Sequence, residues 1–229
     1  MNATIVLHQW EISPFCQKVA RTLRHKGLSY EAVNYNGLLG AKVGRLSKAG
    51  KLPVLDVDGL RIQDSTRIAR YLDEHYPQTP LYPANPQQRA MAEMWEDWAD
   101  ELLYWFEVYF RLKDPEALAM AVRSAGEGRS TFERLPVKLL LKAGLGLQLY
   151  SQGLGRMQRE DVEADFRRHL DRIETVLEGS GWLVGPSMTI ADIAVGSQLL
   201  EVDRTSAPMR PELLSRPKLS AWLDRVRAL

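Results

Sequence analysis

The pattern of apolar and polar positions divides the chain into a first third of mixed character and a longer remainder in which only helical spacing recurs. Short apolar runs typical of buried strands alternate with helical spacing in the first third. The predicted order is a strand at 4–7, a helix after Ser13-Pro14 that ends near Gly27, a strand at 30–34, a hairpin of 54–57 and 60–62 around Asp58-Gly59, and a helix that opens at Asp64-Ser65. The glycine-rich stretch 37–50 is expected to be irregular. This order predicts an α/β domain.

Four prolines spaced three residues apart punctuate residues 77–86, which predicts a linker. Beyond this linker the strand signals stop. Residues 91–109 follow helical spacing and predict a long amphipathic helix. Further helices are predicted from Asp114-Pro115, over 162–177, after Thr189 and over 219–226. The predicted organisation is an α/β domain at 1–76, a linker at 77–86 and an all-α domain at 87–229.

Composition and charge narrow the class of protein. The chain has 229 residues, 45% of them hydrophobic, and a net charge of +1 without a Lys/Arg run, so we expect no nucleic-acid partner. The most apolar stretch, 139–149, is broken by Lys142 and two glycines, so we expect no membrane partner. The histidines lack metal-ligand spacing, so no metal is expected. A single cysteine and an N-terminus unlike a signal peptide favour a cytoplasmic protein.

Three short segments carry a family resemblance. They are Ser13-Pro14-Phe15-Cys16 at the first predicted helix, Lys51-Leu52-Pro53-Val54 followed by Asp64-Ser65, and Trp182-Leu183-Val184-Gly185 leading into Thr189-Ile190-Ala191-Asp192. In this order, on the two sides of a proline-rich linker, they resemble the cytosolic glutathione transferase family of the bacterial type, with serine in the first motif. The resemblance implies a thioredoxin-like N-terminal domain, an all-α C-terminal domain, glutathione as co-substrate and a homodimer. Residues 113–158 depart from the family pattern, because this connection is longer than usual.

The chemistry of glutathione makes Ser13 the predicted catalytic residue. A thiol of this kind has a pKa of about 8.5, so its thiolate needs stabilisation near neutral pH. A helix N-terminus supplies unpaired N–H groups and the positive end of the helix dipole. Ser13 directly precedes the first predicted helix and adds a hydroxyl donor. The alternative is that Ser13 is an ordinary N-cap residue.

Cys16 raises a second possible sulfur chemistry. The segment resembles the Cys-Pro-aromatic-Cys motif of glutaredoxins with serine in place of the first cysteine. A serine cannot form a mixed disulfide with glutathione, so exchange through Ser13 is disfavoured. Cys16 is then a small buried apolar residue. The alternative is a redox role for Cys16 in a glutathione-dependent thiol reductase.

The resemblance also implies the remaining glutathione contacts. Pro53 corresponds to the family's cis-proline, and the main chain of Leu52 would pair with the cysteinyl unit as an added strand edge. Asp64 and Ser65 would hold the γ-glutamyl group at a helix start, and Lys51, or else Lys42 or Lys48, would meet the glycine carboxylate. The alternatives are a trans proline that begins a strand and an Asp-Ser pair that only caps the helix. The predicted glutathione-binding set is Ser13, Lys51, Leu52, Pro53, Asp64 and Ser65.

The aromatic residues of the long helix predict a pocket for an apolar co-substrate. Aromatic side chains go all the way round this helix, so some of them face away from the main core. The candidates for the pocket are Trp10, Tyr104, Trp105 and Phe110, with a subunit interface as the alternative. We therefore expect attack of the glutathione thiolate on an electrophile. A glutathione-dependent isomerase or dehalogenase, a thiol reductase, and a non-enzymatic binding or regulatory protein with the same fold are the alternatives.

Overall fold

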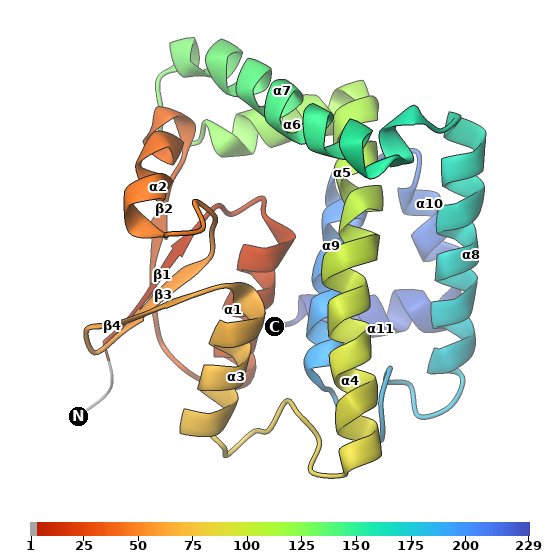
Figure 1. The fold of residues 1–229 in the computed structure, drawn as a ribbon. Helices are drawn as coiled ribbons and strands as arrows, with labels where there is room; N and C mark the ends of the chain where they lie inside the picture. The colour runs from red at the N-terminus through yellow and green to blue at the C-terminus, as the bar shows by residue number, and fades with distance from the viewer. Residues whose placement is uncertain (1–3) are drawn as a thin grey trace.

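A mixed sheet forms the centre of the first part of the chain (Figure 1). The computed structural model describes residues 4–229, and within them the sheet has four strands in the order β2-β1-β3-β4. The central strand β1 (Ile5–Gln9) is parallel to β2 (Glu31–Asn34) and antiparallel to β3 (Val54–Val57). The edge strand β4 (Leu60–Gln63) pairs with β3 across a two-residue turn. The predicted strands and hairpin are confirmed.

Four helical segments accompany the sheet: α1 (Pro14–His25), η1 (Gly37–Lys42), α2 (Val43–Leu46) and α3 (Ser65–His75). Buried leucines, valines and isoleucines of α1, α3 and the strands form one apolar cluster. The short helices η1 and α2 occupy the stretch that we expected to be irregular. Gly37 begins this turn with φ of +61°, a conformation that glycine adopts without steric cost.

The rest of the chain is helical. Its elements are α4 (Pro86–Trp98), the π-helical turn η2 (Ala99–Leu103), α5 (Tyr104–Lys113), α6 (Pro115–Ala125), η3 (Thr131–Glu133), α7 (Arg134–Gln152), η4 (Leu154–Arg156), α8 (Arg159–Leu177), α9 (Ile190–Thr205), α10 (Arg210–Leu214) and α11 (Pro217–Arg227). The elements α4, η2 and α5 follow one another as a single rod, and α6 and α7 lie across its upper end (Figure 1). The predicted long helix is thus confirmed, with a π-helical turn inside it.

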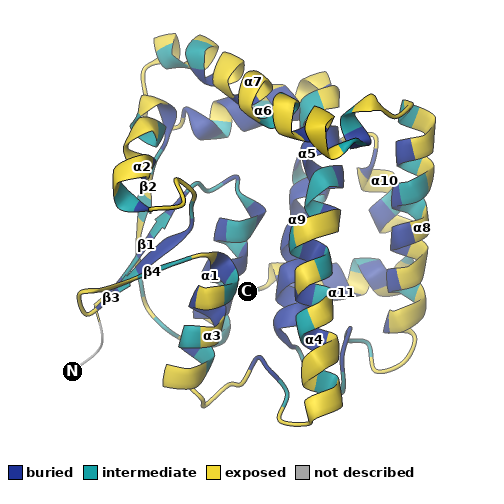
Figure 2. Ribbon diagram, viewed as in Figure 1, coloured by how far each residue is buried: buried dark blue, intermediate teal, exposed yellow. Residues whose placement is uncertain are grey.

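The helix α9 is the centre of the larger core, and most of its residues are buried (Figure 2). Its start is fixed by a capping box between Thr189 and Asp192, as the sequence predicts. The buried carboxylate of Asp192 also accepts hydrogen bonds from the Leu183 N–H at 2.9 Å and from the Trp222 Nε1–H at 2.8 Å. One side chain therefore connects the start of α9, the preceding loop and α11.

The helix α7 is the largest element that the sequence analysis does not predict. Gly144 and Gly146 interrupt its helical spacing, and each glycine lowers helix propensity. The helix forms nevertheless, because Val137, Leu141 and Leu149 bury one of its faces. Tertiary packing thus overrides the local signal. Among the residues described, no helix combines the length and apolar character needed to cross a bilayer.

We predict that Asp192→Ala lowers the free energy of unfolding by roughly 3–5 kcal/mol, because it leaves several buried donors without an acceptor. Urea denaturation followed by circular dichroism measures this loss. Asp224→Ala is the matched control, since Asp224 lies on the exposed surface of α11 and, within residues 4–229, forms an ion pair with Arg227 alone. Equal effects of the two substitutions would contradict a structural role for the capping box.

Candidate functional site

The strand register brings Ser13-Pro14, Leu52-Pro53 and Asp64-Ser65 to one end of the sheet. His8 of β1 lies opposite Val54 of β3, and Val54 lies opposite Gln63 of β4. Residues that follow β1, precede β3 and follow β4 are therefore neighbours. The loop before α1, the Leu52–Pro53 bond and the start of α3 meet at this end of the sheet.

Ser13 stands at the start of α1 with an extended backbone (φ −84°, ψ 122°). Its hydroxyl makes no capping hydrogen bond to the helix, although its carbonyl oxygen accepts a bond from the Gln17 N–H at 2.9 Å. The side chain is half-buried, and the first turn of α1 contains no acidic residue. The positive end of the helix dipole is thus not neutralised from within the helix.

Cys16 lies one turn into α1 and is completely buried. Burial raises the pKa of its thiol to about 12, although hydrogen bonds from the Trp10 N–H and the Ser13 hydroxyl act in the opposite direction. The backbone nitrogen of Trp10 lies 3.4 Å from Cys16 Sγ. A buried thiol with a raised pKa is a poor nucleophile. This environment favours the interpretation of Cys16 as a packed apolar residue.

The Leu52–Pro53 peptide bond is cis, as the resemblance implies. Pro53 is buried, whereas Leu52 is only half-buried and lies just before β3. The preceding loop is connected to the sheet, because the Ser47 hydroxyl donates to Gln63 Oε1 at 2.9 Å. The main chain of Leu52 consequently lies at the end of the sheet where β3 begins, just outside the strand pairing that starts at Val54.

Asp64 and Ser65 form the start of α3. Asp64 has a left-handed backbone (φ 78°), and its Oδ1 accepts a hydrogen bond from the Arg67 N–H at 3.1 Å. Ser65 is only 4% exposed. The pair caps the helix, and the same helix start can bind an anion. Lys51 is exposed, as are Lys42 and Lys48, so burial does not distinguish among these lysines.

A buried arginine that the sequence analysis did not predict fixes the loop before Ser13. Arg111 of α5 donates from Nη2 to the carbonyl oxygen of Ile12 at 2.6 Å. The same nitrogen lies 2.5 Å from Glu107 Oε1 and 3.5 Å from Glu201 Oε2. The helical domain therefore positions the residue directly preceding Ser13. The available sequence signal was the Glu107–Arg111 pair, one helical turn apart in an otherwise apolar segment.

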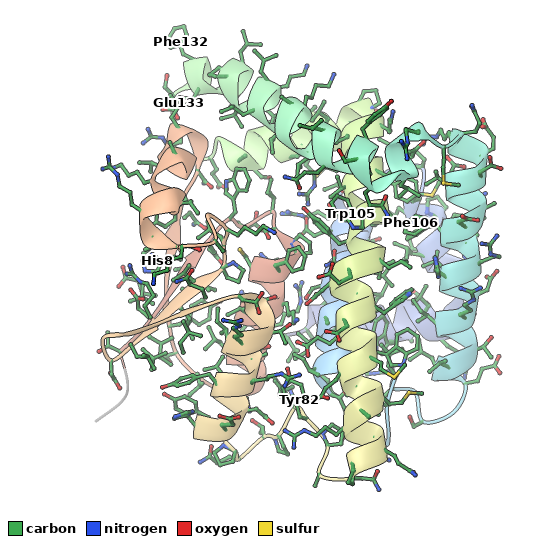
Figure 3. All side chains as sticks on the ribbon, viewed as in Figure 1. His8, Tyr82, Trp105, Phe106, Phe132 and Glu133 are labelled. Carbon is green, nitrogen blue, oxygen red and sulfur yellow. The ribbon has the colours of Figure 1, made fainter. Side chains whose placement is uncertain are left out.

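The segment that departs from the family pattern covers this loop. Ile12 is 2% exposed and belongs to a small apolar cluster, joined by partly buried Trp10. Its other members come from α6 and α7: Leu118, Ala121, Val122, Ala125, Val137 and Leu141. At the start of α7, Glu133 accepts a hydrogen bond from the Leu38 N–H at 2.9 Å (Figure 3). We call α6 and α7 the roof of the site.

The proposed pocket residues differ in position. The Tyr104 ring lies 4.9 Å from that of Phe15 in the first turn of α1, and Trp105 lies 5.2 Å from Tyr104. The indole N–H of Trp10 is buried and has no hydrogen-bond partner among the described residues. Phe110 is fully buried and packs edge-on against Phe166 at 5.1 Å, which leaves it no surface for a ligand.

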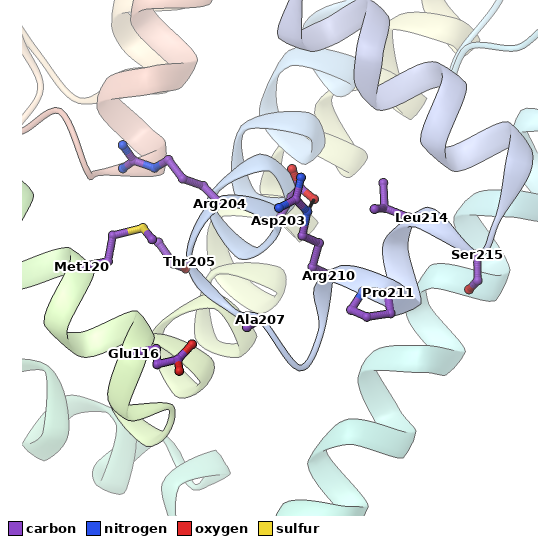
Figure 4. Close-up of a pocket in the computed structure, with 10 residues that line it drawn as sticks. All are labelled: Glu116, Met120, Asp203, Arg204, Thr205, Ala207, Arg210, Pro211, Leu214 and Ser215. Atoms are coloured by element: carbon purple, nitrogen blue, oxygen red, sulfur yellow. Dashed lines mark ion pairs between the residues drawn. The ribbon is translucent and has the colours of Figure 1, made fainter.

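Two surface cavities adjoin α9. The larger, of about 600 Å³, lies near the end of α9, where Arg210 pairs with Asp203 at 3.4 Å (Figure 4). The second, of about 390 Å³, is lined mostly by charged residues of α9 and of the segments beside it, including Glu11 in the loop before α1 and Arg21 of α1. Ser13 and Ser65 line neither cavity. Within residues 4–229 no three His, Cys, Asp or Glu side chains are grouped as a metal site requires.

Comparison with known proteins agrees with these observations. The sequence profile of the glutathione S-transferase N-terminal domain matches residues 7–80, and that of the C-terminal domain matches residues 156–225. The chain belongs to the glutathione S-transferase family. The roof falls between the two matched ranges, in agreement with the departure seen in the sequence. An isoprene-epoxide–glutathione S-transferase of Rhodococcus sp. (strain AD45) is 26% identical, with 95% of this chain and 92% of that protein covered.

Solved structures show the same fold. The β-etherase LigF from Sphingobium sp. strain SYK-6 superposes with a TM-score of 0.72 at 23% identity, covering 99% of this chain and 96% of the other. A glutathione S-transferase from Methylobacterium radiotolerans, solved in complex with glutathione sulfonate, has a TM-score of 0.63 at 24% identity, covering 98% and 91%. The glutathione transferase fold expected from the sequence is confirmed.

The buried cluster around Arg111 predicts a pH dependence of stability. Burial raises the pKa of Glu107 to about 7 from its ordinary 4.5, against the opposing charge of Arg111. Between these values the folded chain binds more protons than the unfolded one, so the contribution of Glu107 to stability falls as pH rises. Glu107→Gln removes this titration. The free energy of unfolding of the Glu107→Gln variant, relative to that of the parent, should increase by roughly 1–3 kcal/mol between pH 4.5 and pH 7.

Urea denaturation at several pH values measures this difference. Glu101→Gln, at an exposed position of η2, is the control and should follow the parent at every pH. A constant difference between Glu107→Gln and the parent across this range would contradict the raised pKa.

Proposed function

We propose that the chain is a glutathione transferase in which Ser13 stabilises the glutathione thiolate for attack on an apolar electrophile. The observation that carries the proposal is the position of Ser13. Its hydroxyl does not cap α1, and it lies at the sheet end that also carries cis-Pro53 and Ser65. Family membership and relatives with glutathione-dependent activities support a glutathione-dependent enzyme.

Each part of glutathione has a counterpart in this arrangement. The γ-glutamyl carboxylate would bind at the start of α3, with Asp64 pairing with the α-ammonium group. The cysteinyl unit would pair with the main chain of Leu52. The thiol would then lie toward the start of α1, where the Ser13 hydroxyl and the helix N–H groups favour the anion. One of the exposed lysines, with Lys51 as the first candidate, would meet the glycine carboxylate.

The reaction is a nucleophilic substitution or addition. The thiolate sulfur forms a bond to an electrophilic carbon. In a substitution the leaving group departs with the bonding electron pair, whereas in the opening of an epoxide the ring oxygen keeps that pair, stays on the product and takes up a proton from solvent. The names of two relatives indicate epoxide and ether substrates for those proteins. We propose that the co-substrate here binds between Trp10 and Tyr104, beneath the roof, with Trp105 beside them. A reductase mechanism through Cys16 is disfavoured, because this thiol is buried and its pKa is raised.

Ser13→Ala tests the mechanism. Loss of one preorganised donor should raise the pKa of bound glutathione and lower turnover of an epoxide or aryl halide by roughly 10–1000-fold. Ser29→Ala, at an exposed position after α1, is the matched control and should keep full turnover. Cys16→Ser separates the alternatives, because a transferase retains its turnover whereas a reductase loses it. Full activity of Ser13→Ala together with inactive Cys16→Ser would overturn the proposed mechanism.

Glutathione binding has a separate test. Millimolar glutathione should raise the melting temperature of the parent, because a ligand that binds the folded state stabilises it by mass action. Ser65→Ala should lose most of this shift, measured against its own melting temperature without ligand. Ser29→Ala should keep the shift. Absence of a shift in the parent would contradict the site. The homodimer and the cytoplasmic location remain predictions from the resemblance and the sequence.

A further inference from the structure

The outward face of α7 is apolar along its whole length. Leu135, Leu139, Ala143 and Leu147 are four residues apart, so they follow one another along one side of the helix. The three leucines of this row are 65%, 59% and 68% exposed. Leu140 and Tyr150 flank the row, and Phe132 precedes the helix, each more than half exposed. We call these residues the outer face of α7; Figure 2 shows that much of this helix is exposed.

The outer face lies outside the buried apolar clusters of the chain. The opposite side of α7 already packs on the roof cluster through Val137 and Leu141, and Leu149 joins the main core. Monomeric proteins rarely expose contiguous apolar patches above a few hundred Å², and larger ones mark interaction sites. The outer face is therefore a surface that a partner would cover.

Every charged residue of α7 and of the segment that joins it to α8 is basic. From Arg134 to Arg159 the sequence has basic residues but no aspartate or glutamate. Arg134, Lys138 and Lys142 are exposed, and in the described part of the chain none of them forms an ion pair. The helix α8 has the same length of 19 residues and carries several acidic side chains. Since the whole chain has a net charge of only +1, the positive charge at α7 is local.

We propose that α7 docks on the surface of an anionic lipid bilayer. A helix with one apolar face and Lys/Arg beside it lies in the plane of the membrane interface, where the apolar face enters the headgroup boundary. Basic side chains near the surface add electrostatic attraction to anionic lipids. The helix lies across one end of the molecule, over α6 and the upper end of the rod (Figure 1).

This surface contact differs from a membrane span, and it revises the sequence expectation of no membrane partner. It rests on α7 alone and does not depend on the proposed glutathione chemistry. A second copy of the chain fits the outer face less well. Two-fold pairing along α7 would bring Lys138 and Lys142 of both copies together, and the helix offers no acidic residue to offset their repulsion.

Vesicle flotation of the full chain tests the apolar contact. We expect the chain to bind vesicles that contain phosphatidylcholine and phosphatidylserine. Binding should be weak to vesicles of phosphatidylcholine alone, and added salt should weaken binding to the anionic vesicles. Leu139→Gln/Leu147→Gln should lower the bound-to-free ratio roughly 10–100-fold. Leu60→Gln/Leu214→Gln is the matched control, since these leucines are 51% and 47% exposed and lie elsewhere. No binding by the parent, or equal loss in both variants, would overturn the proposal.

Two further measurements complete the test. Lys138→Gln and Lys142→Gln should each weaken binding to the anionic vesicles roughly fivefold, whereas Lys218→Gln at an exposed position of α11 should not. Sedimentation velocity of the parent and of the Leu139→Gln/Leu147→Gln variant tests whether a second copy of the chain covers the outer face instead. The same mass for both supports a lipid partner, and a lower mass for the variant would show that the outer face joins protein copies, which overturns the proposal.

Discussion

The buried ammonium group of Lys18 constrains the arrangement of the two domains. Lys18 lies on α1 and is 1% exposed, and its Nζ contacts Glu96 Oε1 at 2.6 Å and Asp100 Oδ2 at 2.8 Å. Burial disfavours the charge, but the two carboxylates keep the pKa of Lys18 above its ordinary value. An unpaired buried charge would be very costly. The helix α1 must therefore stay against the rod formed by α4, η2 and α5.

The position of the proposed catalytic serine follows from this constraint. Lys18 holds the middle of α1, and Arg111 holds the carbonyl oxygen of Ile12 just before the helix. Both contacts join the helical domain to the sheet domain. The sheet register brings together the segments proposed to bind glutathione, whereas the contacts of Lys18 and Arg111 fix the start of α1 relative to the helical domain. The geometry around Ser13 thus belongs to both domains.

The parts that could be predicted from the sequence are those whose physics is local. Asp58-Gly59 specifies a hairpin, Thr189 and Asp192 specify a helix start, and Ser13-Pro14 marks the first turn of α1, each through neighbours a few residues away. The cluster around Arg111 joins residues about a hundred positions apart, so its local part, the Glu107–Arg111 pair, did not indicate the contact with Ile12. The helix α7 escaped prediction because its glycines weaken the local signal and its support comes from packing on the loop before α1. Long-range contacts decided both.

The roof has a consequence for how the family can diversify. The groups assigned to glutathione lie between residues 13 and 65, whereas the roof over the loop before α1 comes from one uninterrupted stretch, α6 to α7. Recombination or insertion within that single stretch can reshape the space proposed for the co-substrate without altering the segments proposed to hold glutathione. In a gene of this organisation, the segment that covers the loop before α1 can be inherited, exchanged or lost as a unit.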